Sequence, residues 1–93
     1  MSNSEFKAQI LYKLVNHRYW GGKHTQKRNA LKGIPPKFYK DFEDALDELI
    51  KEGLILAAPK TKELHIFLNT KKSKEIFELI DKWFKKDVVD PYR

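Results

Sequence analysis

KHTQKRNALKGIPPKFYKDFEDALDELIKEG, residues 23–53, is the stretch that decides the fold of this chain, and its charge reverses halfway along. Up to residue 40 its charged side chains are all basic: Lys23, Lys27, Arg28, Lys32, Lys37 and Lys40. From Asp41 onward it carries six acidic side chains and a single lysine. A basic half suits phosphate and an acidic half repels it, so function depends on which half reaches a partner.

A short helix and a long helix are predicted within this stretch. Thr25 is the expected N-cap of the short one, about Gln26 to Leu31, whose core contacts are Ala30 and Leu31. Gly33 then suits a left-handed position after the helix, and Ile34-Pro35-Pro36 makes a rigid connector. The long helix is expected from Pro36 to Glu52, stopping at Gly53. Its predicted buried stripe is Phe38, Phe42, Ala45, Leu46 and Leu49.

The flanking segments extend this pattern to both sides. A first helix is predicted from Ser4 to about His17, with Ser2 and Glu5 at capping-box spacing, and Trp20 as the start of a brief strand. Its stripe is Phe6, Ile10, Leu11, Leu14 and Val15. Strands are expected over 54–58 and 64–68, joined by a basic tip at 59–63. A last helix, capped by Asn69 or Thr70, is expected to run to about Lys85, ahead of a tail over 87–93.

Composition narrows the class of protein. The chain has 93 residues, 41% hydrophobic and 34% charged, which is typical of one folded domain spanning 1–93. It has no cysteine, no apolar run long enough for a membrane span and no signal-peptide pattern, so a cytoplasmic protein is expected. His17, His24 and His65 lack metal-site spacing, and no cofactor or catalytic motif is visible. We therefore predict a non-enzyme with no metal and no cofactor.

Charge is distributed in blocks along the chain. The formal net charge is +6, which favours polyanionic partners such as nucleic acid. Segments 17–40 and 60–74 are basic, whereas 41–59 between them is acidic. If the fold brings the two basic segments together they form one face, and otherwise the positive charge only solvates the surface.

Three helices followed by a hairpin give an α+β chain whose element order resembles the winged helix-turn-helix superfamily. The resemblance is carried by the start at His24-Thr25-Gln26, the turn KGIPP at 32–36, the run DALDELIKEGLIL at 44–56 and the hairpin at 59–63. With WGGKHT at 20–25, the chain more narrowly resembles small archaeal winged-helix proteins of uncharacterised function, over about residues 5–85.

The resemblance implies double-stranded DNA as the partner and a role in transcription regulation or chromatin. It makes 26–31 the helix that crosses the backbone and 36–52 the recognition helix in the major groove. The residues it implies for DNA contact are Lys23, Thr25, Lys27, Arg28, Lys37, Tyr39 and Lys40, with Lys60 and Lys62 in the wing.

The recognition helix departs from a helix that reads bases. It is expected to expose Lys37, Tyr39, Lys40, Asp41 and Asp44, where bidentate base contact favours Arg, Asn or Gln. We therefore expect only its first turn to enter the groove, with phosphate contacts supplying most of the affinity.

Other interpretations stay open at this point. An interaction module of a transcription, replication or repair assembly would use the acidic side chains Asp44, Asp47 and Glu48. RNA binding would use Tyr39 or Trp20 for stacking. The last helix either completes the core, which we favour, or pairs two copies through Phe77, Ile80, Trp83 and Phe84.

Overall fold

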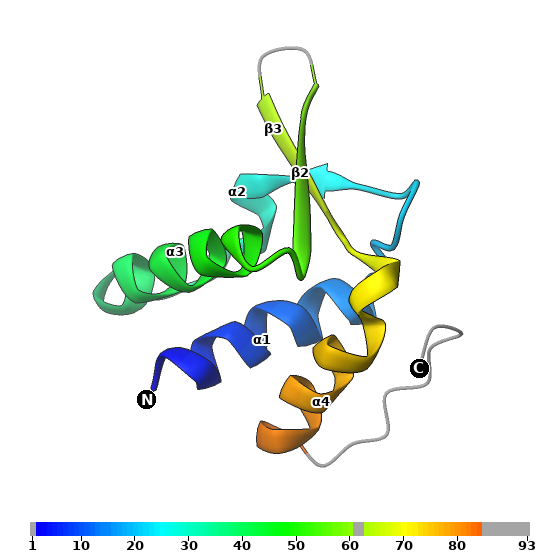
Figure 1. Cartoon of the computed structure of the whole chain (residues 1–93). Helices are drawn as coiled ribbons and strands as arrows, with labels where there is room; N and C mark the ends of the chain where they lie inside the picture. Colours follow the sequence, from blue (N-terminus) through cyan, green and yellow to red (C-terminus); the bar gives the residue numbers. More distant parts are fainter. Residues whose placement is uncertain (1, 61–62, 85–93) are drawn as a thin grey trace.

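The computed structural model describes residues 2–60 and 63–84 (Figure 1). Within them the chain is α+β, with four α-helices and a small three-stranded antiparallel sheet. The elements in order are α1 (Asn3–Asn16), β1 (Thr25–Gln26), α2 (Lys27–Ala30), α3 (Pro36–Lys51), β2 (Ile55–Lys60), β3 (Glu63–Leu68), the 3-10 helix η1 (Thr70–Lys72) and α4 (Ser73–Trp83). This order is compatible with the expected winged helix. The predicted tail over 87–93 lies outside the described residues.

The helices pack around α1, which is amphipathic as predicted. Its stripe of Phe6, Ile10, Leu11, Leu14 and Val15 is buried, and the Ser2 hydroxyl accepts a hydrogen bond from the Glu5 amide at 3.2 Å. α3 lies against one side of this helix and α4 against the other, as Figure 1 shows. The Phe6 ring meets the Phe42 ring edge to face at 4.6 Å between centroids. The core is therefore organised by the first helix of the chain.

α3 begins and ends where the sequence predicts. Pro36 occupies its first turn, where the missing N–H is not needed. At its end Gly53 has φ +82°, and the Leu54 amide donates back to the Leu49 carbonyl at 3.1 Å. This is a Schellman ending, in which glycine adopts the left-handed backbone without a Cβ penalty. It turns the chain directly into β2.

The predicted N-cap at Thr25 is wrong. Thr25 lies in β1, where it pairs with Ile66 of β3, and only 7% of its surface is exposed. Gln26 precedes α2 instead, without a side-chain cap, and the helix is shorter than predicted. The reason is tertiary: a β-branched threonine beside an open strand edge gains more from pairing than from capping one turn of helix. The core contacts Ala30 and Leu31 are buried as predicted.

The sheet is larger than the predicted two-stranded hairpin. Its strand order is β1-β3-β2, so β3 is central, and β2 pairs with β3 from Ile55↔Leu68 to Lys60↔Glu63. Residues 59, 60 and 63, which were predicted to belong to the connecting tip, are therefore part of the strands. Trp20 forms an isolated bridge to Leu68, not the strand expected there. The hairpin extends away from the helices as a two-stranded arm (Figure 1).

α4 closes the core and is preceded by a tighter turn than predicted. The Asn69 side chain accepts from the Lys71 amide at 3.0 Å, which caps η1. Ile76, Phe77 and Ile80 are buried, and the helix ends at Trp83, before the predicted Lys85. No helix among the described residues is long and apolar enough to span a membrane.

Candidate nucleic-acid interface

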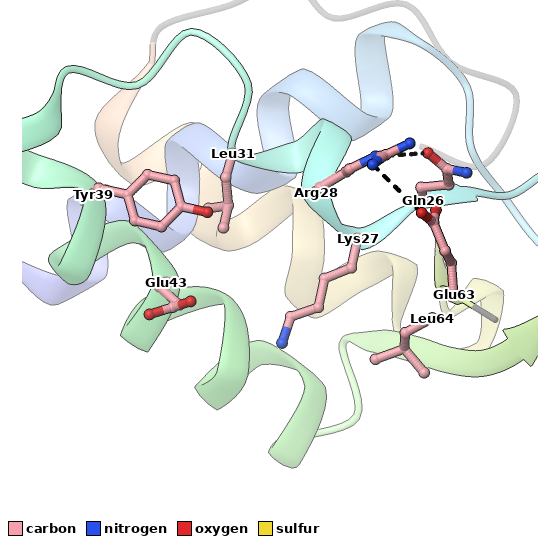
Figure 2. Close-up of a pocket in the computed structure, with 8 residues that line it drawn as sticks. All are labelled: Gln26, Lys27, Arg28, Leu31, Tyr39, Glu43, Glu63 and Leu64. Carbon is pink, nitrogen blue, oxygen red and sulfur yellow. Dashed lines mark hydrogen bonds and ion pairs between the residues drawn. The ribbon is translucent and has the colours of Figure 1, made fainter.

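α2, the start of α3 and the first residues of β3 converge on one face of the molecule. Between them lies a shallow cavity of about 280 Å³, shown in Figure 2. Its lining residues are Gln26, Lys27, Arg28, Leu31, Tyr39, Glu43, Glu63 and Leu64. The fold thus brings together three of the predicted contact residues, Lys27, Arg28 and Tyr39. We call this surface the helix–hairpin face; Lys37 and Lys40, in the first turns of α3, do not line its cavity.

Arg28 links α2 to the hairpin. Its Nε donates to Gln26 Oε1 at 3.0 Å, and its Nη1 lies 3.4 Å from Glu63 Oε1 (Figure 2). The Arg28 side chain is nonetheless 71% exposed. Its guanidinium is therefore available to solvent while being oriented by two neighbours.

Lys27 points along α3 toward its acidic half. Its ammonium lies 2.9 Å from the Asp47 carboxylate, and its side chain is 30% exposed. On the other flank of α3, Lys7 of α1 contacts Glu48 and Glu52, each at 3.0 Å. Much of the acidic half of α3 is therefore engaged by lysines of its own fold, which the sequence alone did not indicate.

Lys40 and Lys37 occupy the first turns of α3. Lys40 pairs with Asp44 at 2.9 Å, one helical turn along, and is 79% exposed. The hydrogen bond that Lys40 donates to Asp44, followed by the charge of the same carboxylate, raises the pKa of Lys40 above its ordinary value. The Lys37 ammonium lies 5.1 Å from the centre of the Phe38 ring and has no carboxylate partner within the described residues. Lys37 is thus the less restrained of the two cations.

The remaining predicted contact residues lie elsewhere. Thr25 is buried and its hydroxyl accepts from Asn29 Nδ2 at 2.9 Å, so its role is structural. Lys23 is exposed in the loop before β1, beside the Tyr19 ring. Lys60 is the last residue of β2, and Lys62 lies outside the described residues.

The helix–hairpin face is mixed in charge where the sequence predicted a basic one. Its cations Lys27 and Arg28 are paired with Asp47 and Glu63, and Lys40 in the first turns of α3 is paired with Asp44. A further carboxylate, Glu43, also lines the cavity. Positive potential here is therefore weaker than the run of basic residues implies.

Sequence reasoning missed several members of this face. Glu63 was assigned to a basic tip, although its place opposite Lys60 in a hairpin register was a signal for cross-strand pairing. Leu64 alternates with the buried Ile66 and Leu68 as predicted, yet it lies beyond the core and is 38% exposed. It forms an apolar edge of the cavity with Tyr39, which is 42% exposed.

His24 and His65 form a contact that no local spacing revealed. Their Nδ1 atoms lie 2.8 Å apart and their rings meet edge to face, across the β1–β3 junction. One nitrogen donates and the other accepts, so the two rings differ in tautomer or protonation. Among residues 2–60 and 63–84 no group of three or more metal-ligating side chains is present.

Comparisons of the chain with protein-family models, with curated proteins and with solved structures found no match in any of the three. The case for a function therefore depends on the geometry and charge described above.

Proposed function

We propose that this protein binds double-stranded DNA through a winged helix-turn-helix, as a transcription regulator or chromatin-associated factor. The observation that carries the proposal is the convergence of α2, the first turns of α3 and the hairpin on one face. Arg28 on that face and Lys40 in the first turns of α3 are highly exposed, at 71% and 79% of their side chains. Phosphate is the DNA group that such side chains meet first.

The ion pairs on this face do not prevent phosphate binding. Exposed ion pairs contribute little to stability, because water and salt screen them. Lys40–Asp44 and Arg28–Glu63 are pairs of this kind. A phosphate contact that also releases counterions competes with them, so both cations can exchange partners when DNA arrives.

Carboxylates limit how closely DNA approaches. Glu43 and Asp44 lie on α3 within one turn of Tyr39 and Lys40, where phosphates would repel them. We therefore infer shallow entry of the N-terminal end of α3 and little direct base reading. Such binding has a steep dependence on salt and a weak dependence on sequence.

The direct test is the paired substitution Lys37→Gln with Lys40→Gln. Binding of a random 20-base-pair duplex is measured by fluorescence anisotropy between about 50 and 200 mM salt, where phosphate contacts dominate. Loss of two phosphate contacts lowers the slope of log affinity against log salt by about 2. An unchanged slope would show that α3 does not contact DNA.

A second test removes the carboxylate partners of the cations and keeps the cations themselves. Asp44→Asn frees Lys40 and Glu63→Gln frees Arg28, and each is expected to tighten duplex binding. Asp81→Asn near the C-terminal end of α4 is the matched control, because Asp81 is exposed and its loss changes net charge equally at a distance from this face. Equal tightening by all three variants would mean that only net charge matters.

A second candidate function is supported by the cavity itself. Tyr39, Leu31 and Leu64 give it an apolar lining, and Glu43 and Glu63 give it negative charge. These features suit a basic segment of a protein partner in a transcription, replication or repair assembly. Absence of duplex binding at about 50 mM salt, where phosphate contacts are strong, would favour this candidate.

A further inference from the structure

Two basic segments far apart in sequence meet at another end of the molecule. The loop after α1 runs along the end of β3: the Leu68 amide donates to the Tyr19 carbonyl at 2.7 Å. The Gly21 amide donates to the Leu68 carbonyl at 3.3 Å. A Cβ added at Gly21 would stand 3.8 Å from the Thr70 methyl group. Residues 18–23 and 68–72 are therefore in contact.

The segments that meet at this contact carry exposed cations. Lys23 comes from the loop, Lys71 from η1 and Lys74 from the first turn of α4, and Arg18 follows the end of α1. All four side chains are exposed. Among the described residues none of the four has an acidic side chain as an ion-pair partner. We call this surface the loop–η1 face.

Its charge is uniform, in contrast to the helix–hairpin face. Neither segment 17–24 nor segment 68–74 contains an acidic residue. The first acid that follows, Glu75, pairs with Lys72 at 3.4 Å, and no other acid of residues 2–60 and 63–84 forms an ion pair with the remaining cations. Unpaired like charges on neighbouring segments produce a local positive potential that paired cations cannot match.

The two faces lie apart in the molecule. In Figure 1 the loop before β1 and η1 lie on the side away from the N-terminal half of α3. The molecule measures 35 × 32 × 21 Å along its principal axes. A duplex that rests on the N-terminal half of α3 can therefore leave the loop–η1 face uncovered.

We propose that the loop–η1 face, formed by Arg18, Lys23, Lys71 and Lys74, is a separate surface for the phosphate backbone of duplex nucleic acid. This inference does not depend on binding by α3. Together with the proposed function, however, it makes the protein a bridge between two duplex segments.

Phosphate fits this face better than a protein partner does. Protein interfaces have an apolar centre surrounded by polar groups. The large apolar side chains that the described chain exposes are Tyr39, Leu56, Leu64 and Trp83, and none belongs to this face. A set of unpaired cations without an apolar centre gains mainly from polyanion charge and counterion release.

The test is the pair Lys23→Gln with Lys71→Gln, two exposed lysines that no described ion pair holds. We expect the slope of log duplex affinity against log salt to fall by about 2 relative to wild type. Lys51→Gln with Lys82→Gln is the control, since it removes the same charge from exposed sites outside both faces. Circular dichroism and thermal melting establish that each variant is folded.

Crossing this pair with Lys37→Gln and Lys40→Gln separates the two proposals. Loss only with the loop–η1 pair supports this inference and contradicts the proposed role of α3. Loss only with the α3 pair, or equal loss in the control, overturns the inference. If both pairs reduce the slope and the two reductions are additive, two separate surfaces are supported. The wild-type protein should then recruit a labelled duplex onto an immobilised duplex, and the loop–η1 variant should fail to do so. If the Lys23→Gln, Lys71→Gln variant binds duplex normally but no longer binds an acidic peptide such as polyglutamate, the partner is a protein and the inference fails.

Discussion

Single residues set the ends of the elements that form the helix–hairpin face. Gly53 ends α3 at φ +82°, and its position fixes where β2 leaves the helix. Gly22, in contrast, has an ordinary φ and open space around an added Cβ. The two glycines therefore have different roles, although composition treats them alike.

We predict that Gly53→Ala destabilises the protein by about 1–2 kcal/mol, the cost of a left-handed backbone for a residue with a Cβ. Gly22→Ala is the control and should leave stability unchanged to within about 0.5 kcal/mol. Urea unfolding followed by circular dichroism measures both. Equal stability of the two variants would contradict the Schellman ending.

The surroundings of Lys7 predict how its contribution to stability depends on pH. Burial lowers its pKa, but hydrogen bonds to Glu52 and Glu48 outweigh burial and raise the pKa of Lys7 overall. A raised pKa means that the interaction stabilises the fold below the unfolded-state value and is lost as pH rises through the folded-state value. The pH range in which this stabilisation is lost is therefore alkaline, above about pH 10.4.

Lys7→Met should cost about 1–2 kcal/mol of unfolding free energy at pH 7, because it removes charged hydrogen bonds from a side chain that is 12% exposed. The difference from wild type should persist to about pH 10 and shrink above it. Urea titrations at pH 7, 9 and 11 check this. A difference that grows with pH would contradict the assigned sign.

At the scale of elements, the half-buried Lys13 holds α2 against α1. The Lys13 ammonium donates to the Asn29 and Lys32 carbonyls, both at 3.0 Å. Burial, and then the charge of Lys32, lower the pKa of Lys13, so the charged form is held at a cost that these two bonds offset. α2 itself has only four residues and needs such support.

We predict that Lys13→Met loosens α2 before it affects the rest of the fold. Hydrogen exchange at the amides of residues 30–34 should accelerate, while α3 amides keep their protection. Lys7→Met serves as the comparison, since Lys7 contacts α3. Uniform loss of protection in the Lys13 variant would show that α2 does not open independently.

The same scale shows why prediction succeeded for some elements and failed for others. α1, α3 and β3 have periodic apolar patterns, and most of their buried residues were predicted from the sequence, although Phe38 is only half-buried and Leu64 is exposed. β1 has only two residues and shows no apolar period, so it forms a strand only because it pairs with β3. The ion pairs Lys27–Asp47 and Arg28–Glu63 join separate elements, so spacing within a single element could not reveal them.

At the scale of the whole molecule, α4 both closes the core and leaves one aromatic edge outside. Phe77 and Ile80 of the proposed pairing surface are buried, and Phe84 stacks on Tyr12 at 4.8 Å between centroids. Trp83 remains 39% exposed, and its Nε1 donates to the Ser4 hydroxyl at 3.0 Å. Pairing of two copies through this helix stays a prediction that centres on Trp83.

Sedimentation between about 10 and 200 µM distinguishes the two roles of Trp83, because a dimer responds to concentration. If copies pair through α4, Trp83→Ser keeps the chain monomeric at the upper concentration. If Trp83 only ties α4 to α1, the variant lowers the melting temperature and leaves the sedimentation of wild type unchanged.

β3 is the central strand, and this has a consequence for the order of synthesis. The partner of β1 is made long after β1 itself, since Thr25 pairs with Ile66. On a ribosome, a chain released only as far as α3 holds its long helices but lacks the strand that fixes β1 and α2. The loop after α1 waits for the same segment, because its amides and carbonyls bond to Leu68. Both proposed nucleic-acid surfaces therefore form late, when β3 has left the exit tunnel, and a nascent chain has neither.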